Sequence, residues 1–189
     1  MQAHPDYALC HMNLGPVYYN TLAYDRAIAC YQKAIQIYEQ NNMHAHPNYA
    51  SCQMNLGDSY VNTLDYVRAI TCFQKAIQIY EQNNMHAHPD YANCHVNLGR
   101  AYIGTLDYDW AIACFQKAIQ IYEQNSMQAH PFYALCQMNL GCAYFLKGKK
   151  DEAVELLEFA LTIYEKSIGK NHPDYQRCLE NLDIMKSKK

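Results

Sequence analysis

The sequence predicts an all-α fold, an α-α solenoid built from antiparallel helix pairs, and two observations lead to this fold class. Nearly the whole chain of 189 residues repeats with a step of 42, and residues 5–46 differ from residues 47–88 at 10 positions. Within each repeat the apolar residues follow helical spacing. Repetition at a period of 20–50 residues is typical of solenoids, in which each unit buries its apolar face against its neighbours.

A His-Pro pair marks the start of the first helix of each repeat. Pro5 suits a first-turn position, where its missing N–H costs nothing, and Asp6 places a negative charge near the positive end of the helix dipole. Apolar residues then recur at helical intervals at Tyr7, Cys10, Leu14 and Tyr18. The first helix of the pair therefore runs from the His-Pro pair to about residue 19.

A short turn and a second amphipathic helix complete the unit. Residues 20–25 separate the two helices, and the next helix carries its apolar residues at Ala27, Tyr31, Ala34 and Tyr38. Residues 41–46 lead to the next His-Pro pair, and such short connections favour antiparallel neighbours. We expect one array over 1–189, with repeats 5–46, 47–88, 89–130 and 131–172 and a capping helix at 173–189.

The charge balance gives no sign of a nucleic-acid or membrane partner. The chain has 15 Lys and Arg against 18 Asp and Glu, a net charge of −3, whereas binding to such polyanions needs a concentrated basic face. No stretch approaches the roughly 18 apolar residues of a membrane span, and no signal peptide opens the chain. We expect a cytoplasmic protein.

The nine cysteines recur at repeat positions, which indicates a structural role. We expect reduced thiols that pack as small apolar side chains. Catalysis needs a single constellation of groups, so this recurrence also predicts that the chain is not an enzyme and needs no cofactor. The pairs His44/His46 and His86/His88 leave metal binding open, but they lack the second ligand pair of a structural zinc site, so we expect none.

The first repeat differs from the others in two ways. Pro16 falls inside its first helix, where an interior proline costs about 3 kcal/mol, so we expect that helix to be bent or shortened unless packing holds it. The residues before Pro5 match linker sequence, so we expect an apolar flank without a polar cap. That flank makes self-association through the first helix pair an alternative function.

The repeat resembles the tetratricopeptide repeat (TPR) family. The family's signature is matched by Leu14-Gly15, Tyr18, Ala27, Tyr31 and Ala34, and it returns in each later repeat. The 42-residue step, the His-Pro-Asp start and the Asn-Leu pair are similar to the variant found in kinesin light chains. This resemblance covers essentially the whole chain. It implies a right-handed α-α superhelix that acts as a protein-interaction scaffold, although the fold serves many pathways.

The resemblance also implies where a partner binds, namely in a concave groove lined by the first helix of each pair. A ladder of amides there would hold the backbone of a partner peptide, as in related scaffolds; the alternative is that each amide ties its helix to a neighbour. Apolar positions would select side chains, unless they are plain packing, and two charged positions vary between repeats. The expected groove residues are the ladder Asn13, Asn55, Asn97 and Asn139, the apolar Met12, Met54, Val96 and Met138, the charged Asp58 and Arg100, and the helix-end Asn20 and Asn62. The groove lacks the repeated Lys/Arg pattern that clamps a terminal carboxylate in some relatives.

Overall fold

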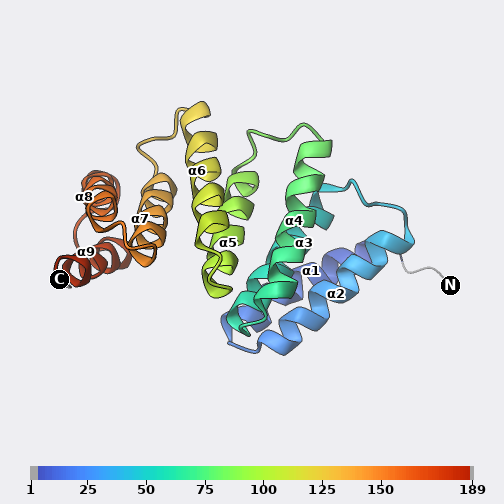
Figure 1. Ribbon diagram of the computed structural model, residues 1–189. Helices are drawn as coiled ribbons and strands as arrows, with labels where there is room; N and C mark the ends of the chain where they lie inside the picture. Colours follow the sequence, from blue (N-terminus) through green and yellow to red (C-terminus); the bar gives the residue numbers. More distant parts are fainter. Residues whose placement is uncertain (1–3, 188–189) are drawn as a thin grey trace. The chain divides into compact units, whose positions relative to one another are not determined.

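The computed structural model describes residues 4–187, which form nine α-helices and no strand (Figure 1). The chain divides into two compact units, Met1–Thr105 and Leu106–Lys189, called unit 1 and unit 2 below. We call the first helix of each repeat an A helix and the second a B helix. The A helices are α1 (Pro5–Asn20), α3 (Pro47–Asn62), α5 (Pro89–Gly104), α7 (Pro131–Leu146) and α9 (Pro173–Ser187); the B helices are α2 (Tyr24–Gln40), α4 (Tyr66–Gln82), α6 (Tyr108–Gln124) and α8 (Lys150–Ser167).

The predicted helix starts are confirmed, and the histidine before each proline acts as the N-cap. The Nδ1 atom of His46 accepts a hydrogen bond from the backbone N–H of Asn48 at 3.1 Å, which satisfies one of the free donors of the first turn. The same bond occurs at His4, His88, His130 and His172. The recurrence of these histidines therefore has a local structural cause.

In the first, second and fourth repeats, the A helix crosses its own B helix closely where the A helix has a glycine. A Cβ atom built on Gly57 of α3 would lie 2.7 Å from the buried ring of Phe73 on α4, and one on Gly141 of α7 would lie 2.4 Å from Leu157 on α8. Contacts that short cannot be accommodated without moving the side chain or the helix. The glycine therefore sets the distance between the two helices of a pair, and the large B-helix side chain fills the space beside it.

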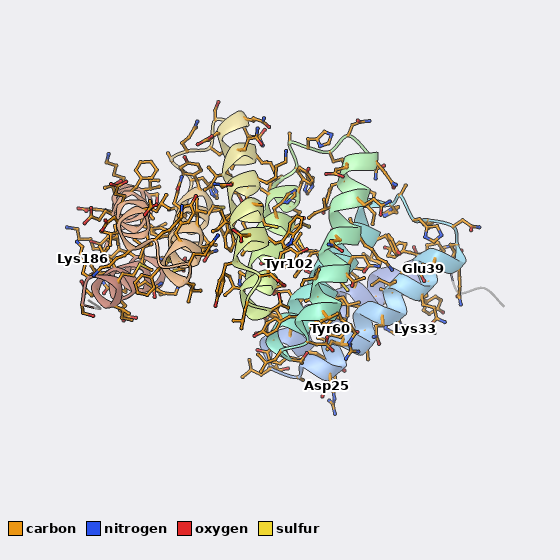
Figure 2. All side chains as sticks on the ribbon, viewed as in Figure 1. Asp25, Lys33, Glu39, Tyr60, Tyr102 and Lys186 are labelled. Carbon is orange, nitrogen blue, oxygen red and sulfur yellow. The ribbon has the colours of Figure 1, made fainter. Side chains whose placement is uncertain are left out.

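Each B helix also packs on the A helix of the next repeat, and a recurring pair of hydrogen bonds ties the two together. Between α2 and α3, Gln32 donates to the Tyr60 hydroxyl at 2.9 Å, and the Tyr49 hydroxyl donates to Glu39 at 2.9 Å. Figure 2 labels Glu39, Tyr60 and its repeat counterpart Tyr102. The early residue of the B helix meets the late residue of the A helix, so the two run antiparallel.

The connections contain backbone geometry that the sequence did not indicate. Leu22, Leu64 and Leu106 adopt left-handed φ values of 60°, 63° and 65° in the turn between the A and B helices. The fourth repeat has Gly148 at the same position, with φ of 80°. A leucine is strained in this region, so the turn lowers the stability of the first three repeats. Glycine avoids this strain in the fourth repeat.

Pro16 does not shorten its helix. The helix α1 spans 16 residues, as many as α3, which has Asp58 at the equivalent position. The full length agrees with the exception named for Pro16, namely that packing holds the helix, because α1 packs on α2 and α3.

The expected apolar flank is present on α1. Tyr7, Leu14 and Val17 are largely exposed, whereas their counterparts on α3 are buried. At the other end of the chain, α9 packs on α8 and α7 and buries Cys178 and Leu182.

Candidate functional site

Successive A helices lie next to one another within each unit, so each unit presents an A-helix face. In unit 1, α3 contacts both α1 and α5; in unit 2, α7 contacts α9. Because the A helices of the four repeats begin 42 residues apart and have equal lengths, residues 42 apart occupy equivalent places on these faces. The residues predicted from the sequence to meet a partner can therefore be followed from helix to helix.

A connected set of polar side chains crosses the A-helix face of unit 1. The hydroxyl of Tyr19 on α1 donates to Asp58 Oδ2 on α3 at 2.6 Å, and Asn62 Nδ2 donates to the Tyr19 hydroxyl at 2.9 Å. From α5, Arg100 Nη1 lies 3.5 Å from Asp58 Oδ1 and donates to Asn97 Oδ1 at 3.1 Å. We call these five residues the polar chain, and it joins all three A helices of unit 1.

The acid at the centre of the polar chain has two partners of different character. Asp58 has about a quarter of its side chain exposed, and it is held by a neutral phenol on one side and a guanidinium on the other. Burial raises the pKa of Tyr19 to about 12, and the neighbouring carboxylate of Asp58 adds to the shift. Tyr19 therefore stays a neutral donor at physiological pH, and Arg100 supplies the compensating charge.

Sequence reasoning placed Asp58, Asn62, Asn97 and Arg100 on this face, but it missed Tyr19. Tyr19 stands where the later repeats have Val61, Ile103 and Phe145, so the repeat pattern alone indicates an apolar position. The sequence does contain a signal, because Tyr19 is the one residue of that set with a hydroxyl. Asp58 lies 39 residues after Tyr19, which is three residues less than one repeat, and this offset places Asp58 on α3 next to Tyr19 on α1.

The asparagine ladder does not share one environment. Asn13 is exposed and Asn55 is partly exposed, while Asn97 accepts from Arg100 on its own helix. The Nδ2 atom of Asn139 is buried, and within the described residues it has no hydrogen-bond partner. The equivalent Asn181 on α9 reaches Cys142 on α7, with Nδ2 3.8 Å from Sγ.

The predicted apolar and helix-end positions also divide. Met12 and Met54 are partly exposed on α1 and α3, and Asn20 and Asn62 are exposed at the ends of those helices. Val96 and Met138 are buried, so they offer little surface to a partner. The accessible part of the predicted site therefore lies mainly on α1 and α3.

The cysteines are free thiols with a packing role in the inner repeats. Six of the nine are buried, and burial raises the pKa of the Cys52 thiol to about 12 and that of Cys72 to about 11. Cys10 on α1 is exposed, so the expectation of a buried thiol is wrong at that position. The reason is the uncovered flank of α1.

Within the described part of the chain, no group of three or more His, Cys, Asp or Glu side chains comes close enough to hold a metal ion.

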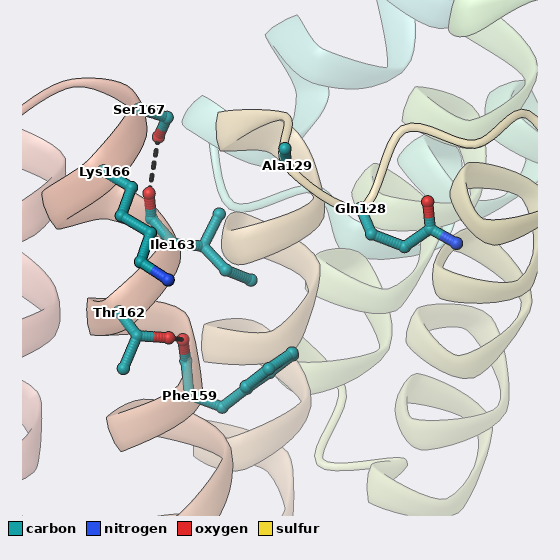
Figure 3. A pocket seen from close by; sticks show the side chains of 7 residues that line it. All are labelled: Gln128, Ala129, Phe159, Thr162, Ile163, Lys166 and Ser167. Atoms are coloured by element: carbon teal, nitrogen blue, oxygen red, sulfur yellow. Dashed lines mark hydrogen bonds between the residues drawn. The ribbon is translucent and has the colours of Figure 1, made fainter.

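A cavity of about 410 Å³ lies in unit 2, away from the predicted groove residues (Figure 3). Gln128 and Ala129 of the linker before α7 form one side, and Phe159, Ile163 and Lys166 of α8 lie among the residues opposite. Phe159 replaces the lysine that the other three repeats carry at this position, and its ring is about half exposed. The cavity therefore has a phenylalanine wall where the other repeats have a lysine.

No helix among residues 4–187 has the length and the apolar character that a membrane crossing requires. A search of curated protein sequences finds no match. Solved structures do match, and they show the fold. A crystal structure of a putative kinesin light chain from Podosopora anserina, with nearly identical TPR-like repeats, has a TM-score of 0.80 and 22% identity, over 96% of this chain and 86% of that one.

Two other solved structures agree. BtubC (BKLC) from P. vanneervenii has a TM-score of 0.80 and 21% identity, over 90% of this chain and 68% of that one. The apo form of RapI has a TM-score of 0.73 and 19% identity, over 94% of this chain and 47% of that one. The predicted fold class of all-α TPR helix pairs, and the predicted likeness to kinesin-light-chain-type repeats, are confirmed. Because the sequence profile of the tetratricopeptide repeat also matches residues 6–82, 55–124 and 106–166, the chain belongs to the tetratricopeptide repeat family.

Proposed function

We propose that this protein is a non-enzymatic scaffold that binds an extended segment of a partner protein along the A-helix face. Family membership supports a protein-interaction role. The observation that carries the more specific proposal is the polar chain, because its hydrogen bonds link three successive A helices of unit 1. A surface ordered before binding loses less entropy when it captures a flexible segment.

The residues around the polar chain define the chemistry of the partner. Asn13 and Asn55 form no side-chain hydrogen bond within the described residues, and an amide can both donate to and accept from a peptide backbone. Met12 and Met54 beside them offer adaptable apolar contacts. Arg100 keeps donors beyond those directed at Asp58 and Asn97, which favours an acidic side chain in the partner.

The proposal can be tested with peptides selected for binding to the intact chain. Twelve-residue peptides displayed on phage are selected on the wild-type protein, and their affinities are then measured by fluorescence anisotropy for Asn55→Ala with Asn97→Ala, and for Arg100→Ala. We expect about a thirty-fold loss of affinity for the double variant, since each lost amide contact is worth about 1 kcal/mol and two are removed. The thermal midpoint should change little because both amides lie at least partly on the surface.

Phe159→Lys is the matched control, because it restores the residue of the other repeats and alters the unit 2 cavity. Selected peptides should bind this variant as they bind the wild type. Peptides that tolerate the asparagine and arginine variants but lose affinity for Phe159→Lys would reject the A-helix face and favour the cavity.

Self-association through the first helix pair is the second candidate function, and the exposed apolar flank of α1 is the observation that favours it. Sedimentation velocity at several concentrations separates the two. A strict monomer excludes self-association as the main role, whereas a dimer that dissociates on Leu14→Lys supports it.

The compartment, the class of partner and the extent of the repeat array complete the proposed function. We propose that the protein acts in the cytoplasm, with neither nucleic acid nor membrane as partner, and that residues 1–189 form one array of repeats 5–46, 47–88, 89–130 and 131–172 with 173–189 as cap. The net charge of −3 supports the choice of partner class, because polyanions attract a basic surface.

A further inference from the structure

Three contacts between a B helix and the following A helix use the same residues. In the α2/α3, α4/α5 and α6/α7 interfaces, a B-helix glutamine donates to one A-helix tyrosine, and a B-helix glutamate accepts from another. The glutamine and glutamate lie seven residues apart and the tyrosines eleven. The pairs are Gln32–Tyr60 with Glu39–Tyr49, Gln74–Tyr102 with Glu81–Tyr91, and Gln116–Tyr144 with Glu123–Tyr133.

The helix α1 carries the same receiving residues. Tyr7 and Tyr18 are the counterparts of Tyr49 and Tyr60, and Cys10 and Leu14 lie between them on the same flank. Even the ring contact is kept, because the Arg26 guanidinium lies 5.7 Å from the centre of the Tyr18 ring, as Arg68 lies 4.7 Å from that of Tyr60. The flank of α1 therefore has the pattern of a surface that accepts a B helix.

Within the described residues nothing covers this flank. Tyr7 is 63% exposed, against 5% for Tyr49, and Leu14 is 45% exposed, against 5% for Leu56. Cys10 is exposed, whereas Cys52 is fully buried. The residues are identical, so the difference arises because α2 covers this flank on α3 and no helix among residues 4–187 covers it on α1.

We infer that the flank of α1, formed by Tyr7, Cys10, Leu14 and Tyr18, is a docking site for an amphipathic helix of a partner protein that carries the pattern Gln-x-x-Ile-x-x-x-Glu. The three internal interfaces give this pattern, in which the isoleucine is Ile35, Ile77 or Ile119. The helix lies antiparallel to α1, with its glutamine at Tyr18 and its glutamate at Tyr7. Burial of the apolar residues supplies the affinity and the two hydrogen bonds fix the register.

A second folded copy of this chain does not offer such a helix. The B helices already pack on the A helices that follow them, so the sides that would dock on α1 are covered. These pairs are α2 with α3, α4 with α5, α6 with α7 and α8 with α9. The occupant is therefore a helix of another protein whose apolar side is free. Direct contact between the α1 flanks of two copies is a separate possibility, and the test below detects it as a dimer.

The test uses Cys10 as a reporter at the centre of the flank. The probe is a synthetic peptide with the sequence of residues 66–82, with Cys72→Ser and blocked ends, added to the full chain during modification by a thiol reagent. We expect saturating peptide to slow modification of Cys10 by about ten-fold, because a covered thiol must be uncovered to react. The Cys10→Ser variant assigns the reporter signal.

Matched controls test the chemistry of the contact. A peptide that also carries Gln74→Ala and Glu81→Ala should protect Cys10 several-fold less well, and so should the natural peptide on the Tyr7→Phe, Tyr18→Phe protein. A further protein, in which residues 24–46 are repeated directly before Pro5, should protect Cys10 without peptide, since the helix is then supplied at high effective concentration.

Three results would overturn the inference. The first is protection in the extended protein but none by the peptide, which would show a surface for stacking within one chain and not for docking. The second is equal protection by the natural and the substituted peptide, which would remove the stated pattern. The third is a dimer at assay concentration whose Cys10 is protected without peptide, which would assign the flank to a second copy.

Discussion

Replacing Tyr19 with phenylalanine tests the polar chain directly. The hydroxyl donates to a carboxylate at 2.6 Å between α1 and α3, and hydrogen bonds to charged groups are worth about 1.5–3 kcal/mol. Because Asp58 is partly exposed and keeps Arg100 as a partner, Tyr19→Phe should lower the free energy of unfolding by about 1.5 kcal/mol, the lower end of this range. The phenyl ring stays, so packing is unchanged.

This loss of stability should be largest in the first helix pair, because the stability of a repeat protein is the sum of the stabilities of its repeats and of the interfaces between them. Amide hydrogen exchange followed by mass spectrometry should show α1 exchanging about ten-fold faster in Tyr19→Phe, since each 1.4 kcal/mol is a factor of ten. Exchange in α7 should be unchanged. The matched control is Tyr18→Phe, whose hydroxyl forms no hydrogen bond within the described residues.

A double-mutant cycle with Asp58→Asn supplies the coupling between the two side chains. We expect a coupling energy near 1 kcal/mol, within the range for residues in one hydrogen-bond network. If Tyr19→Phe and Tyr18→Phe exchange alike, or if the coupling is zero within error, the polar chain does not hold α1 to α3 and the argument for an ordered groove fails.

Three further predictions concern the turns and the thiols. Leu64→Gly should raise the free energy of unfolding by about 1 kcal/mol in urea denaturation, because the exposed leucine is strained at φ 63°, and Gly148→Leu should lower it by a similar amount; a destabilised Leu64→Gly would contradict the strain. In the native protein a thiol reagent should modify Cys10 first and Cys136 only on unfolding, as peptide mapping would reveal. Burial raises the pKa of Cys52 to about 12 from a usual 9.0, so its contribution to stability is complete below pH 9 and is lost as the pH rises from there to about 12; a free energy of unfolding that stays flat over that range would refute the assignment.

Much of the fold follows from local signals in the sequence. The His-Pro pairs mark every A-helix start because the histidine caps and the proline suits the first turn. The glycine and the large B-helix residue opposite it are both visible in the repeat signature. These features are local or recur at a fixed step, and a single sequence displays them directly.

The site is only partly visible in the sequence. Periodicity places Asp58 and Arg100 on one face, but it does not say that Asp58 also accepts a hydrogen bond from Tyr19. Likewise, the identical asparagines of the ladder look equivalent, whereas the structure gives Asn13 an exposed place and Asn139 a buried one without a partner among the described residues. Contacts across helices depend on the neighbours of each repeat, and those differ along the chain.

The repeat, the helix pair and the surface that each A helix offers to a B helix all follow from the order of the amino acids. Which of these surfaces are covered depends on how the helices pack in the folded chain. Tyr7 and Tyr49 are the same residue in the same local pattern, yet one is exposed and the other buried. The physical reason is that burial belongs to the pair of surfaces that meet, and a local pattern encodes only one member of that pair.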